Sequence, residues 1–348
     1  MTGILKENKI IIEEEKKADQ IYNKGYFGEP LSHGGLELDL YEGLYLMEAD
    51  RLRITDENGE DVEREDIIEK ISEEDFHREY LPYKDMRMRG YVLKKASDPA
   101  SFRVFPRGGG PNKTPSKYWL FTYRERDVFD INEVIENHDQ VSNLKKTMLT
   151  ALVDEEGDVT YYVFSTIDLD GSIEKYDQEK LKGLLYGDGT IINRDYEKLY
   201  NDNFYGFEEE DTLRLSIYET LYLVQTNSLH ITEIDTRKPL TEEDLKSIYE
   251  ENRSEFQTEY NVYKDLRERG LIPKTGFKYG TPFRAYSADP DEKHAEYIIQ
   301  PLRKNYKSQW YQVSRAVRVA HSVRKHFLYA SVKDSGDVDY LKIKRETP

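Results

Sequence analysis

Residues 263–270 read Tyr-Lys-Asp-Leu-Arg-Glu-Arg-Gly, and residues 83–90 read Tyr-Lys-Asp-Met-Arg-Met-Arg-Gly. Outward from these two octapeptides, further matches follow in the same order in both halves of the chain, at an offset of roughly 180 residues. They pair 40–46 with 217–223, 102–105 with 283–286, and 157–159 with 336–338. Ordered matches over the full length are hard to obtain by chance, so the sequence predicts a tandem duplication.

Each half of the chain divides again close to its Tyr-Lys-Asp motif. The earlier part of each half holds strand-like apolar pieces, at 10–12 and 213–215, and an acidic piece with helical periodicity, at 65–71 and 241–249. The predicted segments are 1–82 and 83–165 in repeat 1, a polar linker at 166–180, and 181–258 and 259–348 in repeat 2. We expect an α/β (α+β) fold, built as a tandem duplication of a two-domain unit.

Length and composition restrict the class of protein. The 348 residues are enough for two or more domains, and 28 tyrosines add to the burial that 37% apolar residues supply. The absence of cysteine excludes disulfides, thiolate metal sites and cysteine nucleophiles. The sequence has no stretch near 18 apolar residues and no apolar leader at its start. We therefore expect a soluble cytoplasmic protein with no membrane partner.

The net charge of −17 is unevenly distributed. Residues 261–348 contain 18 basic and 10 acidic side chains, against 33 and 58 in the rest of the chain. A basic segment attached to an acidic body is typical of a protein that meets phosphate groups in one region. An ordinary solvated surface would give the same counts, so charge alone leaves both readings open.

The basic segment shows a definite order of expected elements. Tyr263 and Leu266 lie on one face of a helix at 259–269, Gly270 follows its end, and a loop occupies 274–280. The remaining elements are strands at 283–286 and 297–299, a helix at 313–327 with one basic face, and a hairpin of 327–332 and 338–344. Strands with packed helices make a small mixed unit.

Several motifs in this segment resemble one known family. They are the octapeptide at 263–270, Lys-Thr-Gly-Phe-Lys-Tyr-Gly (274–280), Phe-Arg-Ala-Tyr (283–286), His294, and Val-Arg-Val-Ala-His-Ser-Val-Arg-Lys (317–325). Together they resemble the catalytic domain of the archaeal tRNA-splicing endonucleases (tRNA-intron lyases), in the fused-repeat homodimeric form. The resemblance implies a restriction-endonuclease-like mixed sheet in each later domain. It makes 83–165 a degenerate nuclease-like domain and 259–348 the catalytic one.

The resemblance also implies that Tyr286, His294 and Lys325 are the catalytic residues. This set can cut RNA without a metal or cofactor, because attack of a 2′-hydroxyl on its own phosphodiester needs a base, an acid and a stabiliser of negative charge. An imidazole exchanges protons near neutral pH, so His294 suits the acid, and Lys325 suits the phosphorane. Tyr286 is the family's proposed base, although its hydroxyl can instead position the 2′-hydroxyl. The products would be 2′,3′-cyclic phosphate and 5′-hydroxyl ends.

Repeat 1 lacks two of these three groups. Tyr286 matches Phe105, which has no hydroxyl, and the segment that aligns with the histidine, Thr-Pro-Ser-Lys at 114–117, contains none. The lysine is retained as Lys146. The sequence therefore predicts a structural copy joined to an active copy.

The resemblance further implies an RNA clamp and a substrate. By spacing, Arg318 matches the arginine of a clamp that grips a bulged base, and Tyr340 falls near its second member. The implied substrate is precursor tRNA folded as a bulge–helix–bulge and recognised by its shape and splayed bases. A homodimer would offer two active sites to the two bulges, and no DNA partner is expected.

Two alternatives stay open at this stage. A metal-dependent nuclease of similar fold needs clustered acids beside a lysine, whereas Asp289, Asp291 and Glu292 fall in one loop without a partner on a neighbouring strand. A non-catalytic RNA-binding or structural subunit would not need the catalytic set to be intact.

Overall fold

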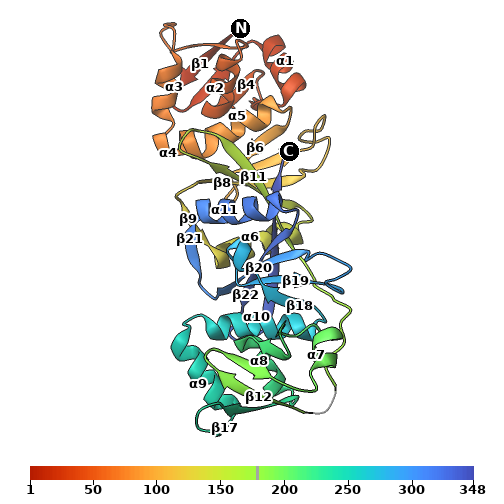
Figure 1. The fold of residues 1–348 in the computed structure, drawn as a ribbon. Coiled ribbons are helices and arrows are strands. Elements are labelled where there is room, and N and C mark those ends of the chain that lie inside the picture. The colour runs from red at the N-terminus through yellow and green to blue at the C-terminus, as the bar shows by residue number, and fades with distance from the viewer. Residues whose placement is uncertain (178–179) are drawn as a thin grey trace. The chain divides into compact units, whose positions relative to one another are not determined.

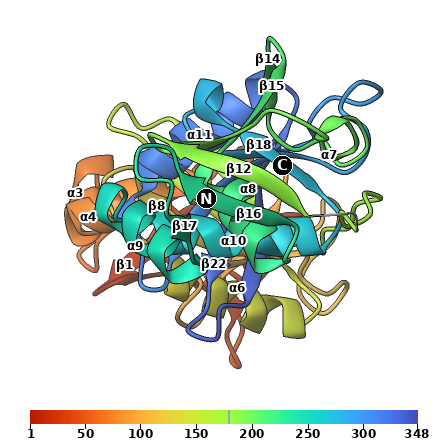
Figure 2. The ribbon, with the colours of Figure 1, turned by 60° about the horizontal axis from the view of Figure 1, so that its bottom comes forward.

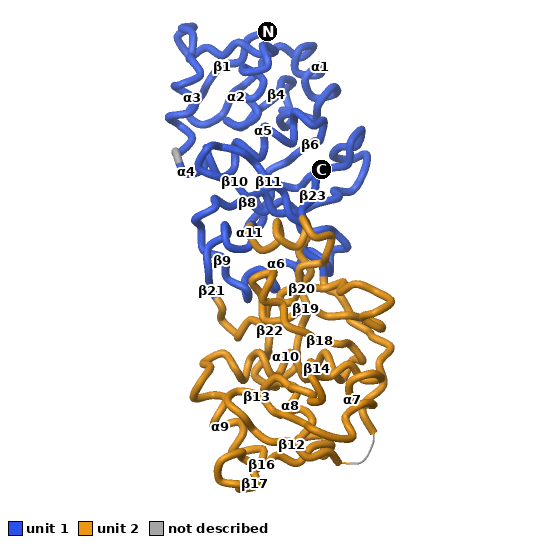
Figure 3. Tube along the Cα trace, viewed as in Figure 1, with its two compact units in different colours: residues 1–165, 307–314, 345–348 blue, residues 166–306, 315–344 orange. Residues whose placement is uncertain are grey.

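The computed structural model describes residues 1–177 and 180–348, which divide into two compact units (Figure 3). Unit 1 contains residues 1–165, 307–314 and 345–348, and unit 2 contains residues 166–306 and 315–344. Two short pieces of repeat 2 therefore belong to unit 1. Of the expected linker at 166–180, positions 178 and 179 lie outside the described residues. In the described part of the chain, no helix is both long and apolar enough to cross a membrane.

The N-terminal part of unit 1 is a mixed sheet with short helices (Figure 1). Its strands are β1 (Thr2–Lys6), β2 (Lys9–Ile12), β3 (Glu29–Pro30), β4 (Leu36–Asp39) and β5 (Arg53–Thr55), in the order β3-β4-β2-β1-β5. The helices are α1 (Glu15–Gly25), α2 (Leu40–Glu48), α3 (Arg64–Lys70) and α4 (Glu73–Asp75). Side chains alternate along β2 and β4, so Ile10, Ile12, Leu36 and Leu38 enter the core.

A second set of strands in unit 1 pairs in the order β11-β10-β8-β7-β6. These are β6 (Val92–Lys95), β7 (Phe102–Phe105), β8 (Tyr118–Arg124), β10 (Thr147–Val153) and β11 (Val159–Thr166). A π-helical turn, η1 (Phe76–Tyr80), runs into α5 (Leu81–Met88), and α6 (Ile131–Asn143) connects the parallel pair β8 and β10. The short strand β9 (Val128–Asp130) pairs with β21 (Lys307–Gln309), its counterpart from repeat 2.

Unit 2 begins with a sheet of the same pattern, ordered β14-β15-β13-β12-β16-β17. Its strands are β12 (Leu181–Tyr186), β13 (Gly189–Ile192), β14 (Phe207–Glu209), β15 (Thr212–Leu215), β16 (Leu229–Glu233) and β17 (Pro239–Leu240). Its helices are α7 (Glu197–Asn201), α8 (Ile217–Gln225) and α9 (Glu242–Asn252). The parallel pair β12 and β16 lies side by side in Figure 2 and corresponds to the parallel pair β1 and β5 of unit 1.

The remaining strands of unit 2 pair in the order β18-β19-β20-β22-β23. They are β18 (Ile272–Thr275), β19 (Phe283–Tyr286), β20 (Tyr297–Arg303), β22 (His326–Val332) and β23 (Val338–Glu346), accompanied by α10 (Phe256–Glu268) and the 3₁₀ turn η2 (Phe277–Tyr279). Helix α11 (Trp310–Ser322) precedes β22 in the chain. Among the described strands of this set, β20 and β22 form the parallel pair, as β8 and β10 do in the second set of strands of unit 1.

Both repeats contain a matching aromatic triplet in the core region, with tilted or edge-on rings. It consists of Tyr41, Tyr83 and Phe102 in unit 1 and of Tyr218, Tyr263 and Phe283 in unit 2. Shared strand order and shared core positions confirm the predicted α/β duplication. The finer boundaries within each repeat, at 82/83 and 258/259, stay predictions.

One expected element of repeat 2 is corrected. The helix predicted at 313–327 ends at Ser322, and β22 already begins at His326. Arg324 has a left-handed φ of 55°, and the N–H of Lys325 donates to the Ala320 carbonyl at 2.9 Å, which closes the helix with a Schellman-type turn. An apolar residue at 327 fits the helix period and the strand alike, so the pattern hid this break. Lys325 consequently lies before a strand and not on a helical face.

Candidate active site

Three strand ends meet at one edge of the second sheet of unit 2. Ala285 of β19 pairs with Tyr297 of β20, and Tyr297 pairs with His326 of β22. Just beyond this row, the N–H of Glu296 donates to the Ala285 carbonyl at 3.1 Å, and the N–H of His326 donates to the Glu296 carbonyl at 2.9 Å. The backbone ladder thus brings the segments that flank these residues together.

The three predicted catalytic residues all lie at this edge. Tyr286 ends β19, His294 precedes β20 in a loop, and Lys325 directly precedes β22. The Nζ of Lys325 donates to the carbonyl of Ala295, which ties the lysine to the segment that carries His294. Among the described residues, no hydrogen bond joins the three side chains to one another. Such contacts commonly form only when substrate binds.

The loop that carries His294 is held by its own backbone. The N–H of Lys293 donates to the Asp289 carbonyl at 2.9 Å, and the N–H of Asp291 donates to the Asp289 side chain at 2.8 Å. His294 itself is exposed. A large substrate can therefore reach the imidazole directly.

A carboxylate stays ionised close to this loop. Glu296 accepts hydrogen bonds from the Ser287 hydroxyl and from Lys293, whose Nζ lies 2.6 Å away. Burial raises the pKa of Glu296, but these two hydrogen bonds together with the positive charge of Lys293 hold the pKa below its usual value. The edge therefore presents both signs of charge at neutral pH.

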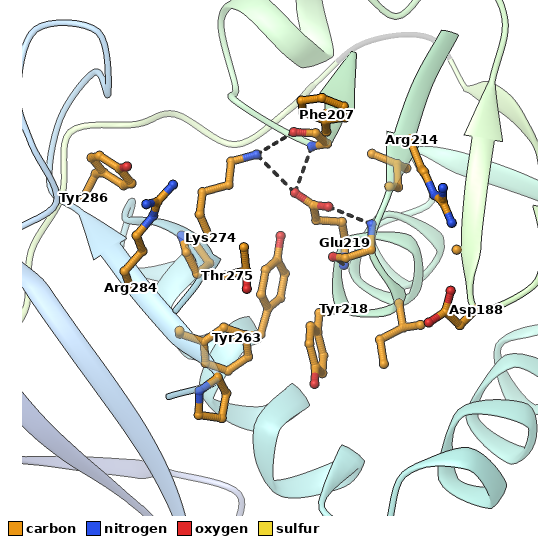
Figure 4. A pocket seen from close by; sticks show the side chains of 18 of the residues that line it. Asp188, Phe207, Arg214, Tyr218, Glu219, Tyr263, Lys274, Thr275, Arg284 and Tyr286 are labelled. Carbon is orange, nitrogen blue, oxygen red and sulfur yellow. Dashed lines mark hydrogen bonds and ion pairs between the residues drawn. The ribbon is translucent and has the colours of Figure 1, made fainter. Parts of the chain in front are cut away.

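Tyr286 also lines a pocket of about 600 Å³ within unit 2 (Figure 4). The guanidinium carbon of Arg284 lies 5.6 Å from the centroid of the Tyr286 ring, and the Arg284 Nε is buried with no hydrogen-bond partner among the described residues. This separation is within the range of a cation–π contact, which holds the Tyr286 ring beside the guanidinium. The arrangement can therefore assist Tyr286 whether it takes a proton or orients a hydroxyl.

A buried ion pair crosses the same pocket. The Nζ of Lys274 lies 3.5 Å from the Glu219 carboxylate and donates to the Gly206 carbonyl at 2.8 Å. Burial raises the pKa of a carboxyl, but the Lys274 charge and the N–H groups of Ser216 and Gly206 hold the pKa of Glu219 below its usual value. This pair joins helix α8 to β18.

The two predicted clamp residues differ in their exposure to solvent. Arg318 is exposed on α11. Tyr340 is only 4% exposed, and its hydroxyl donates to Asp265 at 2.7 Å. Burial, followed by the Asp265 charge, raises the pKa of Tyr340. A ring covered to this degree offers little surface for stacking on a nucleobase, and the clamp role of Tyr340 stays a prediction.

Several residues near the site were not predicted from the sequence. The ring centroid of Tyr279 lies 5.9 Å from the Lys325 Nζ, and Arg284 and the pocket residues Phe207 and Arg214 were not singled out. Tyr279 and Arg284 sit inside the motifs at 274–280 and 283–286, where the sequence pointed to neighbours instead. For the described residues, no group of three or more His, Asp or Glu side chains is arranged to hold a metal ion.

The corresponding edge of unit 1 has the same backbone and different side chains. The N–H of Lys117 donates to the Val104 carbonyl at 2.8 Å, and the N–H of Thr147 donates to the Lys117 carbonyl at 3.2 Å. This register places Phe105, Pro115 and Lys146 where unit 2 has Tyr286, His294 and Lys325. Lys146 also follows a left-handed residue, and its N–H closes α6 on the Val141 carbonyl at 3.1 Å.

Two family descriptions each match the chain twice. That of the tRNA intron endonuclease catalytic C-terminal domain matches residues 76–161 and 256–340. That of the tRNA intron endonuclease N-terminal domain matches residues 1–68 and 181–246. The matched ranges follow the two repeats seen in the sequence and in the fold.

Individual relatives carry the same name along nearly the full chain. The chain is 32% identical over 345 residues to the tRNA-splicing endonuclease of Methanococcoides burtonii, which covers 96% of this chain and 97% of that protein. It is 34% identical over 336 residues to that of Methanosarcina acetivorans, with 94% of each covered. The enzyme of Methanopyrus kandleri is 37% identical over 157 residues, which is 45% of this chain but 87% of that protein. That relative thus has the size of one repeat.

Proposed function

The chain belongs to the tRNA intron endonuclease family, and from this premise we propose that it excises introns from precursor tRNA by metal-independent cleavage of RNA. The observation that carries the proposal is the register of β19, β20 and β22, which gathers Tyr286, His294 and Lys325 at one sheet edge in repeat 2. Repeat 1 has the same edge and lacks two of the three groups.

The proposed reaction is an attack of the 2′-hydroxyl on the adjacent phosphorus. The 2′-oxygen forms a bond to phosphorus while its proton passes to a base, for which Tyr286 is the candidate, or to solvent with Tyr286 holding the hydroxyl in place. The ammonium of Lys325 stabilises the extra negative charge of the phosphorane. His294 gives a proton to the departing 5′-oxygen. The products are a 2′,3′-cyclic phosphate and a 5′-hydroxyl, and no cofactor enters the balance.

The proposed substrate is a bulge–helix–bulge in precursor tRNA, cut at both bulges. One chain offers one complete catalytic set, so we propose that two chains assemble as a homodimer to present two sites. An unpaired nucleotide at each bulge exposes the 2′-hydroxyl in the geometry that in-line attack requires. Arg318, on α11, is the exposed candidate for gripping a bulged base.

The deciding experiment is cleavage of a bulge–helix–bulge RNA in EDTA by the wild type and by His294→Ala, with the product ends analysed. We expect the wild type to cut to cyclic phosphate ends and His294→Ala to cut at least a hundredfold more slowly. Cleavage that needs added Mg²⁺ would favour a metal-dependent nuclease. RNA binding without any cleavage would favour a structural subunit.

A further inference from the structure

The pocket beside Tyr286 has a basic and aromatic lining that the catalytic set does not use. Arg214, Arg253 and Arg284 line it together with Phe207. In Figure 4, Arg284 and Tyr286 stand on one side of the pocket and Arg214 on the other. Its volume of about 600 Å³ falls within the roughly 300–1,000 Å³ of sites that enclose small ligands, so a nucleotide can enter it.

Phe207 and Arg214 form an open cross-strand pair at the rim. They pair directly between β14 and β15, and Phe207 is 67% exposed. Arg214 is also exposed and makes no ion pair with any described residue. An exposed ring on which a base can stack, next to a cation that attracts phosphate, is the combination with which proteins hold single-stranded nucleic acid.

Repeat 1 shows acidic side chains at the same positions. Glu29 and Glu37 pair between β3 and β4 in the register that Phe207 and Arg214 occupy in repeat 2. In this strand pair, one change from acid to arginine and one from acid to phenylalanine thus separate the pocket of repeat 2 from its counterpart.

Two lysines in this part of repeat 1 are neutralised by ion pairs. Lys9, which matches Gly189, pairs with Glu37, and Lys95, which matches Thr275, pairs with Glu79. In the pocket of repeat 2, Glu219 is occupied by Lys274, and the exposed Asp188 is the other carboxylate of the lining. Arg253 pairs with Glu259 at 3.5 Å, so Arg214 and Arg284, set against Asp188, leave the lining of repeat 2 with an excess of positive charge.

We propose that this pocket is an RNA subsite that holds unpaired nucleotides next to the scissile phosphate. Tyr286 belongs to both the catalytic edge and the pocket lining, so the occupant is continuous with the cleaved nucleotide. Phe207 stacks on a base, and Arg214 and Arg284 contact backbone phosphates. The inference rests on the proposed function and adds a requirement to it: a single-stranded stretch must continue past the cleaved bond.

The test uses the full chain and a bulge–helix–bulge RNA with 2′-deoxy nucleotides at both cleavage positions. Affinity is measured by fluorescence anisotropy over a series of salt concentrations for the wild type, Arg214→Glu, Arg214→Lys and Phe207→Ala. The matched control is Arg103→Glu, which makes the same charge change at an exposed position of repeat 1 that corresponds to Arg284. Single-turnover cleavage of the unmodified RNA is measured in parallel.

We expect Arg214→Glu to weaken binding about tenfold and to reduce the salt slope by about one, while Arg214→Lys keeps the slope and Arg103→Glu binds as the wild type does. Phe207→Ala should weaken binding roughly tenfold through lost stacking. In cleavage, both losses should raise the RNA concentration needed for half-maximal rate and leave the saturated rate unchanged.

Three results would overturn the subsite. The first is that the wild type cleaves RNA, while Arg214→Glu and Phe207→Ala both bind the deoxy RNA with the affinity of the wild type. The second is an equal loss of RNA affinity in Arg103→Glu, which would mean that the effect depends only on the overall charge of the protein. A third is a labelled polyglutamate peptide that binds the wild type and not Arg214→Glu, with RNA affinity unaffected, which would assign the pocket to an acidic protein segment. A wild type that binds the deoxy RNA but never cleaves the unmodified one would instead break the proposed function.

Discussion

In repeat 1 the hydroxyl of Tyr161 donates to Asp85 at 2.7 Å, and in repeat 2 the hydroxyl of Tyr340 donates to Asp265 at 2.7 Å. An arginine one turn further along each helix bonds the same carboxylate, again at 2.7 Å in both repeats. The edge that holds Tyr286 in repeat 2 holds Phe105 in repeat 1 on an unchanged backbone. The pair of repeats thus works as an internal control: contacts kept in both belong to the fold, and residues that differ are candidates for chemistry.

Substitution of the buried lysines tests whether contacts kept in both repeats belong to the fold. It should give the largest change in the free energy of unfolding. Lys274→Met breaks the pair with Glu219, and Lys94→Met breaks the pair with Glu42 in repeat 1. Each change leaves a buried carboxylate without its countercharge, which typically costs about 3–5 kcal/mol. We expect both variants to lose this much free energy of unfolding in urea. A loss in only one of them would show that the two repeats do not share this device.

Both repeats retain a lysine at this edge, so its role in the fold can be tested separately from its role in catalysis. Lys325→Ala removes the proposed stabiliser of the phosphorane, whereas Lys146→Ala removes a lysine held by the same helix-ending turn in repeat 1. We expect Lys325→Ala to slow single-turnover cleavage by about 10²–10³-fold, as loss of one electrostatic stabiliser usually does. Lys146→Ala should cleave at the wild-type rate. Equal slowing in both would assign the lysine a structural role.

The internal alignment explains how far the sequence could predict the site. Tyr286, His294 and Lys325 were predicted as catalytic residues from the three motifs that contain them. The structure places all three at one edge of the sheet. The end of the helix near Arg324 could not be predicted, because an arginine in the left-handed conformation gives no sequence signal comparable to a glycine.

Other parts of the site depend on contacts that a single sequence does not display. The burial of Tyr340 follows from its partner Asp265, which lies far away in the chain. The alignment of the two repeats contains the change from Glu37 to Arg214. Only the structure shows that Arg214 lines the same pocket as Tyr286. Long-range packing, and not local pattern, decided both points.

The matched tyrosines provide a smaller effect that sharpens the comparison. Tyr340→Phe and Tyr161→Phe each remove one hydrogen bond to a carboxylate that an arginine still holds. We expect each to lower the free energy of unfolding by about 1–3 kcal/mol. Affinity for the deoxy RNA should stay unchanged in Tyr340→Phe, because the ring is buried and remains in place. Weaker RNA binding in Tyr340→Phe alone would support the predicted clamp role of Tyr340.

The smallest expected effect concerns His326, where repeat 1 has Thr147 at the matched position. Burial first, and then the charge of Lys342, lower the pKa of His326, although Glu296 acts in the opposite direction. A histidine whose pKa is lower in the folded state than in the unfolded chain stabilises the fold above its usual value near 6.5. That contribution is lost as the pH falls through the folded pKa.

His326→Thr should therefore lose less stability than the wild type when the pH is lowered from 7 to 5. Because His326 is exposed, the difference between the two proteins should stay below about 1 kcal/mol. The measurement is the free energy of unfolding at both pH values, with His33→Thr as the control at an exposed histidine of repeat 1. If His326→Thr and the wild type show the same pH dependence, the neighbouring lysines do not discriminate against the protonated imidazole. Position 326 would then count among the differences between the repeats that carry no energetic consequence.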